Sequence, residues 1–141
     1  MVKTVRKGYR LERLAESHLQ NQGYQTHRAA KSGFTIHGKY FTRSNDIFGC
    51  IDIIAISPTN RTRFIQVTSG TVSKSTKFKK LAEVDWNLGY SNVELWMYIG
   101  RGKWEIYRLT GVKEEYELIK YALIEKGREF ISINQGKKIS V

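Results

Sequence analysis

The chain has 141 residues, with 24 Lys or Arg against 13 Asp or Glu, so its net charge at pH 7 is +11. Its length suits one domain over residues 1–141, and a hydrophobic fraction of 40% with a single Pro excludes a disordered basic tail. Its apolar runs are too short to span a membrane and its N-terminus has no signal-peptide pattern, so we expect an intracellular protein. One cysteine and three scattered histidines exclude structural zinc.

The positive charge is confined to the first part of the chain. Residues 1–80 contain 15 Lys or Arg and 4 acids, whereas residues 81–141 contain 9 of each. Bases placed on phosphates release counterions, so nucleic acid is the expected partner, with a generally basic surface as the alternative. Carboxylates oppose phosphate binding unless a divalent metal requires them. The four acids of this part are therefore candidate ligands: Glu12, Glu16, Asp46 and Asp52.

Apolar residues at helical spacing predict an amphipathic helix over about residues 4–22, which ends at a glycine. Glu12 and Glu16 share a face beside the apolar stripe, and Glu12 is the nearer to the stripe. Glu12 is therefore a candidate to lean over a sheet edge, whereas Glu16 is expected to pair with a nearby base. A short strand at 24–30 and a hairpin or long loop at 31–45 are predicted next.

Two strands joined by a tight turn are predicted over residues 47–57 and 63–69. The first is apolar enough to be central in a sheet, yet it contains Asp52, whose carboxylate then requires a donor or a metal ion. Gln66 lies in the second strand, and a simple hairpin register brings Asp52 and Gln66 to the same edge. Asp46 is either a further ligand or a cap of the turn before the first strand.

A second helix is predicted over about residues 74–88, with a cluster of lysines in its first turns. Lysines at the start of a helix oppose the helix dipole, and a bound phosphate would relieve this penalty. These lysines therefore form either a phosphate-binding face or a solvated one: Lys74, Lys77, Lys79 and Lys80.

Residues 93–99 and 103–109 are two apolar segments separated by a Gly-Arg-Gly turn, and they predict a second hairpin. This hairpin contains Trp96 and Trp104. The two indoles either fill the core or supply a dimer interface.

A final helix over about residues 113–125 and a short tail at 130–133 complete the predicted elements. The predicted order is helix, strands, helix, hairpin, helix. It favours an α/β or α+β fold in which helices pack on a mixed central sheet.

Residues 5–80 resemble a nuclease family through several motifs in the same order. KGYRLE at 7–12 resembles the K-G-x-x-x-E opening of archaeal Holliday-junction resolvases, and YQTHRAAKSG resembles the strand region that follows it there. DIIA at 52–55 and IQVT at 65–68 resemble the Asp … (Glu/Gln)-x-Lys core of the PD-(D/E)xK nuclease superfamily. None of these motifs is specific by itself, and their joint order carries the resemblance. The variant is similar to nuclease-like proteins of phages and of archaeal viruses or plasmids.

The resemblance implies a restriction-endonuclease-like fold and an endonuclease that depends on Mg²⁺ or Mn²⁺. It makes Glu12 the acid of the first helix, Asp52 the central metal ligand and Gln66 a neutral second ligand, with the Val67 carbonyl as a further ligand. Thr68 stands where the family has its catalytic lysine, which orients or deprotonates the attacking water. The candidate replacements lie on the following helix: Lys74, Lys77 and Lys80.

Basic residues of the first 80 positions are the expected contacts to the DNA backbone. They are Lys7, Arg10, Arg28, Lys31, Lys39, Arg43, Lys74, Lys77, Lys79 and Lys80. The resemblance also implies a homodimer, because two symmetric nicks at a junction require two active sites.

We therefore expect a metal-dependent endonuclease that hydrolyses DNA phosphodiester bonds, with branched DNA as a candidate substrate. The first alternative is a catalytically degenerate protein that keeps the nuclease fold and binds DNA. The second is a virion or assembly protein that packages nucleic acid. We favour the nuclease because Glu12 and Asp52 persist in a region with little other negative charge.

Overall fold

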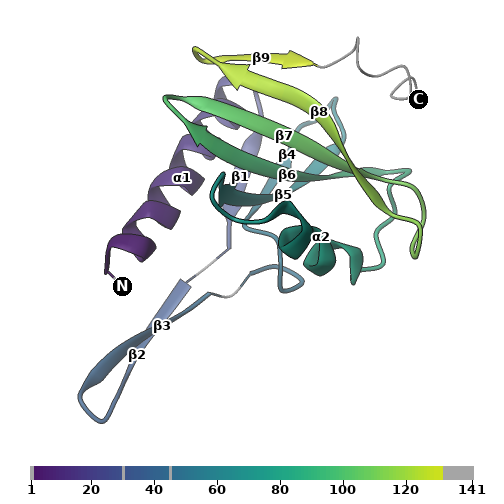
Figure 1. Ribbon diagram of the computed structural model, residues 1–141. Helices are drawn as coiled ribbons and strands as arrows, with labels where there is room; N and C mark the ends of the chain where they lie inside the picture. Colours follow the sequence, from purple (N-terminus) through teal and green to yellow (C-terminus); the bar gives the residue numbers. More distant parts are fainter. Residues whose placement is uncertain (1, 30, 45, 132–141) are drawn as a thin grey trace.

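A computed structural model describes residues 2–29, 31–44 and 46–131, and shows two helices and a strongly curled sheet (Figure 1). The main sheet has seven strands in the order β1-β4-β5-β6-β7-β8-β9. Its β5–β6 pairing is parallel and the other pairings are antiparallel, which makes the sheet mixed and confirms the predicted α+β class. The elements are α1 (Val2–Asn21), β1 (Gln25–Arg28), β2 (Lys31–Ile36), β3 (Lys39–Ser44), β4 (Ile53–Ile56), β5 (Thr62–Ser69), α2 (Lys74–Ala82), β6 (Ser91–Gly100), β7 (Lys103–Thr110), β8 (Glu117–Glu125) and β9 (Arg128–Ile131).

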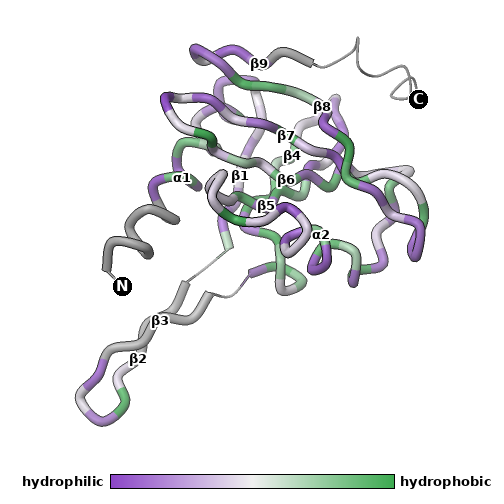
Figure 2. The backbone as a smooth tube through the Cα atoms, in the orientation of Figure 1, coloured by the Kyte–Doolittle hydropathy of each residue, from purple (hydrophilic) through white to green (hydrophobic). Residues whose placement is uncertain are grey.

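The two helices cover opposite faces of the main sheet. Leu11, Ala15 and Leu19 of α1 pack in one buried cluster with Ile53 and Ile65 of the sheet. A second buried cluster lies on the other face, beneath α2: Leu81, Cys50, Ile51, Val93, Leu95 and Met97. Side chains alternate between the two faces along each strand, so β4 and β5 supply both clusters. Figure 2 shows the corresponding hydrophobic stretches along the strands of the main sheet.

The predicted hairpin at residues 31–45 is confirmed as the separate two-stranded sheet of β2 and β3, which projects from the body of the protein (Figure 1). Its turn is formed by His37 and Gly38, whose φ angles are 51° and 78°. Two successive left-handed residues match the twist of the flanking strands, and glycine adopts this conformation without strain.

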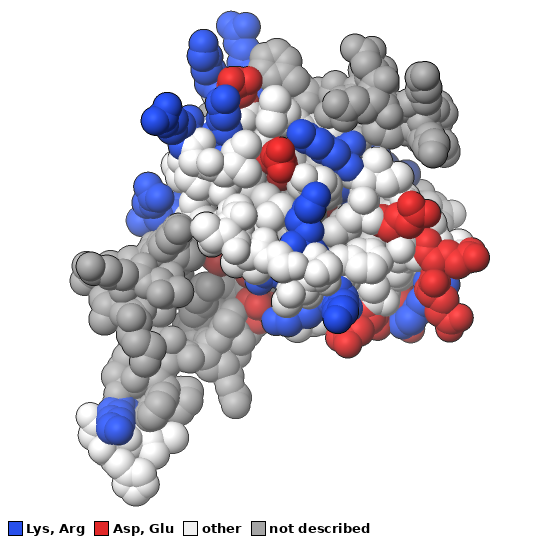
Figure 3. Space-filling view, in the orientation of Figure 1, with Lys and Arg blue, Asp and Glu red and all other residues white. Residues whose placement is uncertain are grey.

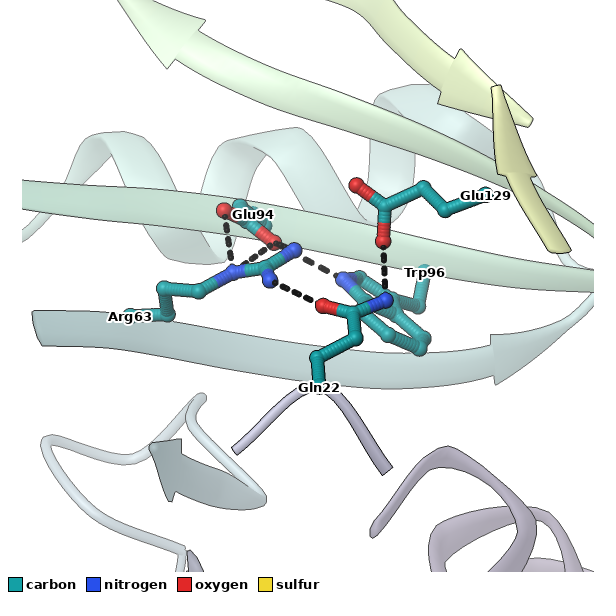
Figure 4. Close-up of polar contacts among 5 residues, drawn as sticks. All are labelled: Gln22, Arg63, Glu94, Trp96 and Glu129. Atoms are coloured by element: carbon teal, nitrogen blue, oxygen red, sulfur yellow. Dashed lines mark hydrogen bonds and ion pairs between the residues drawn. The ribbon is translucent and has the colours of Figure 1, made fainter. Parts of the chain in front are cut away.

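A buried ion pair joins β5 to β6. The Arg63 guanidinium donates from Nε to both carboxylate oxygens of Glu94, at 3.1 and 3.0 Å, and from Nη2 to Oε1 at 2.8 Å (Figure 4). The Trp96 indole also donates to Glu94, at 2.9 Å, and Arg63 Nη1 donates to Gln22 at 3.3 Å. Burial acts to lower the pKa of Arg63, but the Glu94 carboxylate outweighs it and raises that pKa above its usual value. The pair is thus fully charged and well bonded inside the core.

Three expectations from the sequence are corrected. The predicted helix at 113–125 is wrong: β8 occupies most of this segment and pairs with β7 and β9. The tail at 130–133 belongs in part to β9. The helix predicted over 74–88 ends at Ala82, where the Trp86 indole donates to the carbonyl of Leu81 at 2.8 Å and satisfies one of the terminal acceptors.

The strand predicted over 47–57 is also shorter than expected, since β4 begins at Ile53. Residues 47–51 instead form a tight turn closed by a bridge between Ile47 and Ile51. Phe48 and Gly49 at the turn have φ angles of 56° and 76°, which a strand does not allow.

Trp96 and Trp104 are both fully buried, with ring centroids 5.7 Å apart in an edge-to-face arrangement. They therefore fill the core and do not offer a dimer surface. Among the described helices, none is long and apolar enough to cross a membrane.

We predict that Glu94→Leu lowers the free energy of unfolding by about 3–5 kcal/mol, because it leaves the Arg63 guanidinium buried and unpaired. Urea unfolding measures the change. The matched control is Lys103→Met, which removes the exposed ion pair with Glu125 and should cost less than about 1 kcal/mol. The double variant with Arg63→Met and Glu94→Leu should recover much of the lost free energy of unfolding. The prediction is contradicted if removing the buried pair and removing the exposed pair cost the same free energy.

Candidate metal and nucleic-acid site

Asp52 is held in place by both neighbouring strands. Its N–H donates to the carbonyl of Ile65 at 2.9 Å, and its carbonyl accepts from the N–H of Ala29 at 2.8 Å. Its carboxylate oxygen Oδ2 accepts from the N–H of Val67 at 2.8 Å. Asp52 is 8% exposed, so it is a buried carboxylate with one oxygen engaged by the backbone of β5.

Gln66 follows Ile65 on β5, and Ile65 pairs with Ile53 of β4 and accepts the N–H of Asp52. Asp52 and Gln66 are therefore close along the chain to paired residues of neighbouring strands. Gln66 also pairs with Leu95 of β6, which points to the α2 side of the sheet. The side chain is 3% exposed, and its amide oxygen Oε1 accepts no hydrogen bond from the residues that the structure describes. A buried acceptor in this state is costly and calls for a donor or a cation.

Val67 and Thr68 follow Gln66 on β5. In a strand the N–H and C=O groups of one residue point to the same side, so the Val67 carbonyl faces the same side as the N–H that binds Asp52. Thr68 is 6% exposed, and its hydroxyl makes a weak contact of 3.4 Å with the Ser69 carbonyl. A neutral hydroxyl thus occupies the position at which the sequence resemblance expects a lysine.

Glu12 is the acid of α1 that the sequence singles out. It lies on α1 between Leu11 and Ala15, which pack on the sheet, and it is 5% exposed. Gln66 alternates with Ile65, which points toward α1, so the Gln66 side chain lies on the α2 side. The sheet is open at this point, since β4 begins at residue 53 and β1 ends at residue 28 while β5 continues to Ser69.

The pKa of Cys50 depends on the charged side chains near this thiol, and Asp52 is one of them. The pKa of its thiol is raised to about 11, chiefly by burial and also by the carboxylates of Asp46 and Asp52, while the Lys80 ammonium acts to lower it. Lys80 of α2 thus lies within electrostatic range of the same buried thiol as Asp52. Lys80 is exposed and is the α2 lysine whose charge acts on this corner of the sheet.

Lys74 lies at the opposite end of α2. Its ammonium donates to the Tyr107 hydroxyl at 3.3 Å and lies 4.5 Å from the centroid of the Tyr107 ring. Tyr107 belongs to β7, three strands away from β4, which is about 14 Å at the usual strand spacing. Lys77 is half-buried and Lys79 is exposed on the same helix.

The other predicted DNA contacts are distributed over α1, β1 and the β2–β3 hairpin. Lys39 is exposed beside the hairpin turn and Arg10 is exposed on α1. Arg28 Nε forms an ion pair with Glu16 at 2.8 Å, which confirms that Glu16 pairs with a nearby base. The side chains of the remaining three predicted contacts lie outside the described ones: Lys7, Lys31 and Arg43.

Acidic side chains gather elsewhere. On the face shown in Figure 3 they concentrate over the turn that leads from β7 into β8, away from the projecting hairpin. This turn and the start of β8 contain Glu114, Glu115 and Glu117, in the part of the chain with no net charge. The charge asymmetry of the sequence is therefore also an asymmetry in space.

Sequence reasoning did not single out the Arg63–Glu94 pair or the arginines Arg61 and Arg108, which line a pocket at the other end of the sheet. The paired residues are 31 positions apart, and no local pattern connects them. Their proximity follows from the parallel β5–β6 pairing, which the sequence alone did not reveal.

No group of three or more His, Cys, Asp or Glu side chains with the geometry of a metal site occurs among the described residues. The candidate donors are instead all oxygens, from one or two carboxylates, the Gln66 amide and the Val67 carbonyl. Such hard donors suit Mg²⁺ and Mn²⁺.

Comparison with known proteins finds no matching family model and no matching curated protein. Among solved structures, Hjc of Archaeoglobus fulgidus, a Holliday junction resolvase, is similar with a TM-score of 0.48 and 18% identity, over 84% of this chain and 88% of that chain. Similarity at this level leaves the chemistry to be judged from the residues of this chain.

We predict that Gln66→Met, measured by urea unfolding in EDTA, raises the free energy of unfolding by about 1 kcal/mol, because it removes a buried acceptor that has no partner. Gln20→Met is the control, since Gln20 is exposed and donates to Thr26 at 2.9 Å. It should change stability by less than about 0.5 kcal/mol. A loss of more than about 1 kcal/mol in Gln66→Met would show that the amide is satisfied in the folded protein.

Proposed function

We propose that this protein is a divalent-metal-dependent endonuclease that hydrolyses DNA phosphodiester bonds. The observation that carries the proposal is the Gln66 amide oxygen, a buried acceptor without a partner among the described residues, next to Val67, whose N–H binds the Asp52 carboxylate. Burying polar groups of this kind without partners destabilises a structural core, whereas a metal ion can use their oxygen atoms as ligands.

The proposed ligands are the Asp52 carboxylate, the Gln66 amide oxygen and the Val67 carbonyl, with Glu12 as the further acid from α1. These groups fit Mg²⁺ or Mn²⁺ because all are hard oxygen donors. A bound divalent cation would supply positive charge for the phosphate and a more acidic water molecule. The N–H of Val67 fixes the orientation of Asp52, so the carboxylate is positioned before any ligand arrives.

In hydrolysis the water oxygen bonds to phosphorus and one ester oxygen leaves, so the site must also balance charge on the phosphate. Lys80 is the proposed residue for this role because its ammonium acts on the Asp52 corner of the sheet. Lys77, one turn earlier on α2, is the second candidate. Lys74 is less suited, because its ammonium is engaged at Tyr107.

The projecting hairpin and α2 are the proposed DNA-binding elements. Lys39 beside the hairpin turn and Lys79 on α2 are exposed, and both bases would contact phosphates and position the duplex. The acidic turn before β8 would repel the backbone and so limit the orientations of the bound DNA.

Thr68 supports a second candidate, a DNA-binding protein that keeps the nuclease fold without activity. Its hydroxyl is buried and carries no charge, so it cannot perform the task of the lysine that the resemblance places there. The two candidates differ in whether a residue of α2 compensates for this change.

We further propose that the protein acts as a homodimer, because cutting both strands at a junction requires two active sites. The interface must lie outside the buried β6–β7 tryptophans. Static light scattering should give about twice the chain mass of 16.3 kDa. A mass equal to one chain at micromolar concentration would contradict the dimer without affecting the metal site.

For activity, we predict that the protein cleaves supercoiled, linear or four-way-junction DNA with Mg²⁺ or Mn²⁺, and that Asp52→Ala lowers the rate at least about 100-fold. Lys80→Gln should lower it about 10-fold or more, whereas Lys103→Gln, an exposed lysine of β7 paired with Glu125, should leave it unchanged.

Thr68→Lys separates the two candidates in the same assay. If the wild type cleaves, the nuclease is established. If the wild type binds every DNA without cleavage and Thr68→Lys cleaves, the protein is the degenerate binder of a nuclease fold. Salt-sensitive binding with no cleavage by either protein would refute the metal-dependent chemistry as a whole.

A further inference from the structure

A pocket of about 550 Å³ lies at the end of the main sheet opposite to the Asp52 site. Its walls come from the loop before β6, from β6 itself and from the paired ends of β7 and β8. The residues that matter for its chemistry are Arg61, Leu88, Asn92, Arg108, Ile119 and Tyr121. Its volume is in the range of sites for small organic ligands.

Arg108 gives this pocket an unused donor. The centre of its guanidinium group lies 3.7 Å from the centroid of the Tyr121 ring, so the ring holds the planar cation against one wall. Its Nε atom is buried and has no acceptor among the described residues. A buried N–H of a cation without an acceptor is costly, so the charge of this guanidinium group is poorly satisfied by the protein, and an oxyanion is the ligand that guanidinium groups favour.

Arg61 supplies a second positive charge to the same pocket. Its Nη2 group donates to the carbonyls of Leu88 and Ser91, the latter at 3.2 Å, which fixes the guanidinium at the rim. No carboxylate is among the described residues that line this pocket. The nearest buried acid in the register, Glu94, already accepts hydrogen bonds from Arg63 and Trp96. The two arginines therefore face the pocket without a counter-charge from its walls.

Glu129 lies in a smaller adjoining pocket of about 240 Å³, which shares Arg108 and Tyr121 with the first. Its carboxylate accepts from the Gln22 amide at 2.8 Å (Figure 4). This acid marks the boundary of the positively charged region, because an anionic ligand would be repelled from the adjoining pocket and directed toward Arg61.

The remaining walls of the larger pocket are suited to a flat, weakly polar group. Leu88 and Ile119 are apolar, and Asn92 offers an amide that both donates and accepts hydrogen bonds. An anion beside a planar ring with polar edges is the chemistry of a nucleotide. We propose that this pocket binds a nucleoside monophosphate group, with the phosphate on Arg108 and Arg61 and the base against the apolar wall.

This group has two sources: a free nucleotide, or an unpaired nucleotide of a bound strand. In either case the site goes beyond the proposed metal-dependent cleavage. Arg61 precedes Gln66 by five residues of nearly extended chain, which is about 17 Å. The same protein would then hold a nucleotide at one end of β5 and cut a backbone at the other.

The test is isothermal titration calorimetry of the full chain in EDTA, with four probes: 2′-deoxyadenosine 5′-monophosphate, deoxyadenosine, inorganic phosphate and a five-residue oligo(dA). We expect one of the two nucleotide probes to bind at least 10-fold more tightly than deoxyadenosine and phosphate. Tighter binding of the mononucleotide identifies a free nucleotide as the ligand, and binding of the oligonucleotide alone identifies a strand.

Arg108→Gln and Arg61→Gln should each weaken this binding at least 10-fold. Arg108→Lys keeps the charge but loses the planar fork, and it should weaken binding by a similar factor. Arg101→Gln is the matched control, because Arg101 is exposed in the turn between β6 and β7, and it should bind as the wild type does. Circular dichroism confirms that each variant is folded.

Asp52→Ala should bind the nucleotide probes as tightly as the wild type, so this result is independent of whether the protein cleaves DNA. The proposal is overturned if neither nucleotide probe binds, if phosphate alone binds as tightly as the nucleotide, or if the folded Arg108→Gln variant retains wild-type affinity.

Discussion

Arg63 and Glu94 join β5 to β6 at the one parallel pairing among the described strands. A parallel pairing cannot be closed by a short turn, so its register must be fixed by contacts between the strands themselves. The buried ion pair supplies such a contact, and Trp96 and Gln22 satisfy its remaining polar atoms. Once this register is fixed, β4 pairs with β5 and β7 pairs with β6, both in antiparallel orientation. The positions of the polar groups at both ends of β5 depend on it.

Much of the fold could be predicted where local patterns decide the structure. The α1 helix follows from its apolar stripe, and the β2–β3 and β6–β7 hairpins from their glycine turns. The prediction of a helix over 113–125 was wrong because the Glu, Lys, Leu and Ala residues of this segment favour a helix in isolation. In the protein this segment fills the edge of β7, and pairing outweighs intrinsic propensity. A signal was present in Lys126 and Gly127, whose φ angles of 52° and 77° form a two-residue hairpin turn.

The candidate site was predictable to the same extent. Asp52 and Gln66 lie near each other because β4 and β5 form a hairpin encoded by consecutive residues, and the Val67 N–H binds the Asp52 carboxylate. The separation of the α2 lysines was not predictable, because it depends on how the helix crosses the sheet. Lys74 contacts Tyr107 of β7, while the charge of Lys80 acts on the thiol of Cys50. The pocket of Arg61 and Arg108 was missed for a similar reason, since the curl of four strands brings these residues together.

The two outermost strands of the described sheet are among its shortest, with four residues each in β1 and β9. An edge strand exposes unpaired N–H and C=O groups that recruit strands from other molecules. Short edge strands have few such groups. Charged residues on these strands further disfavour pairing with another chain, and they include Arg28 on β1 and Arg128 and Glu129 on β9. A chain with a seven-stranded sheet and two buried apolar clusters is in this way protected against edge-to-edge aggregation.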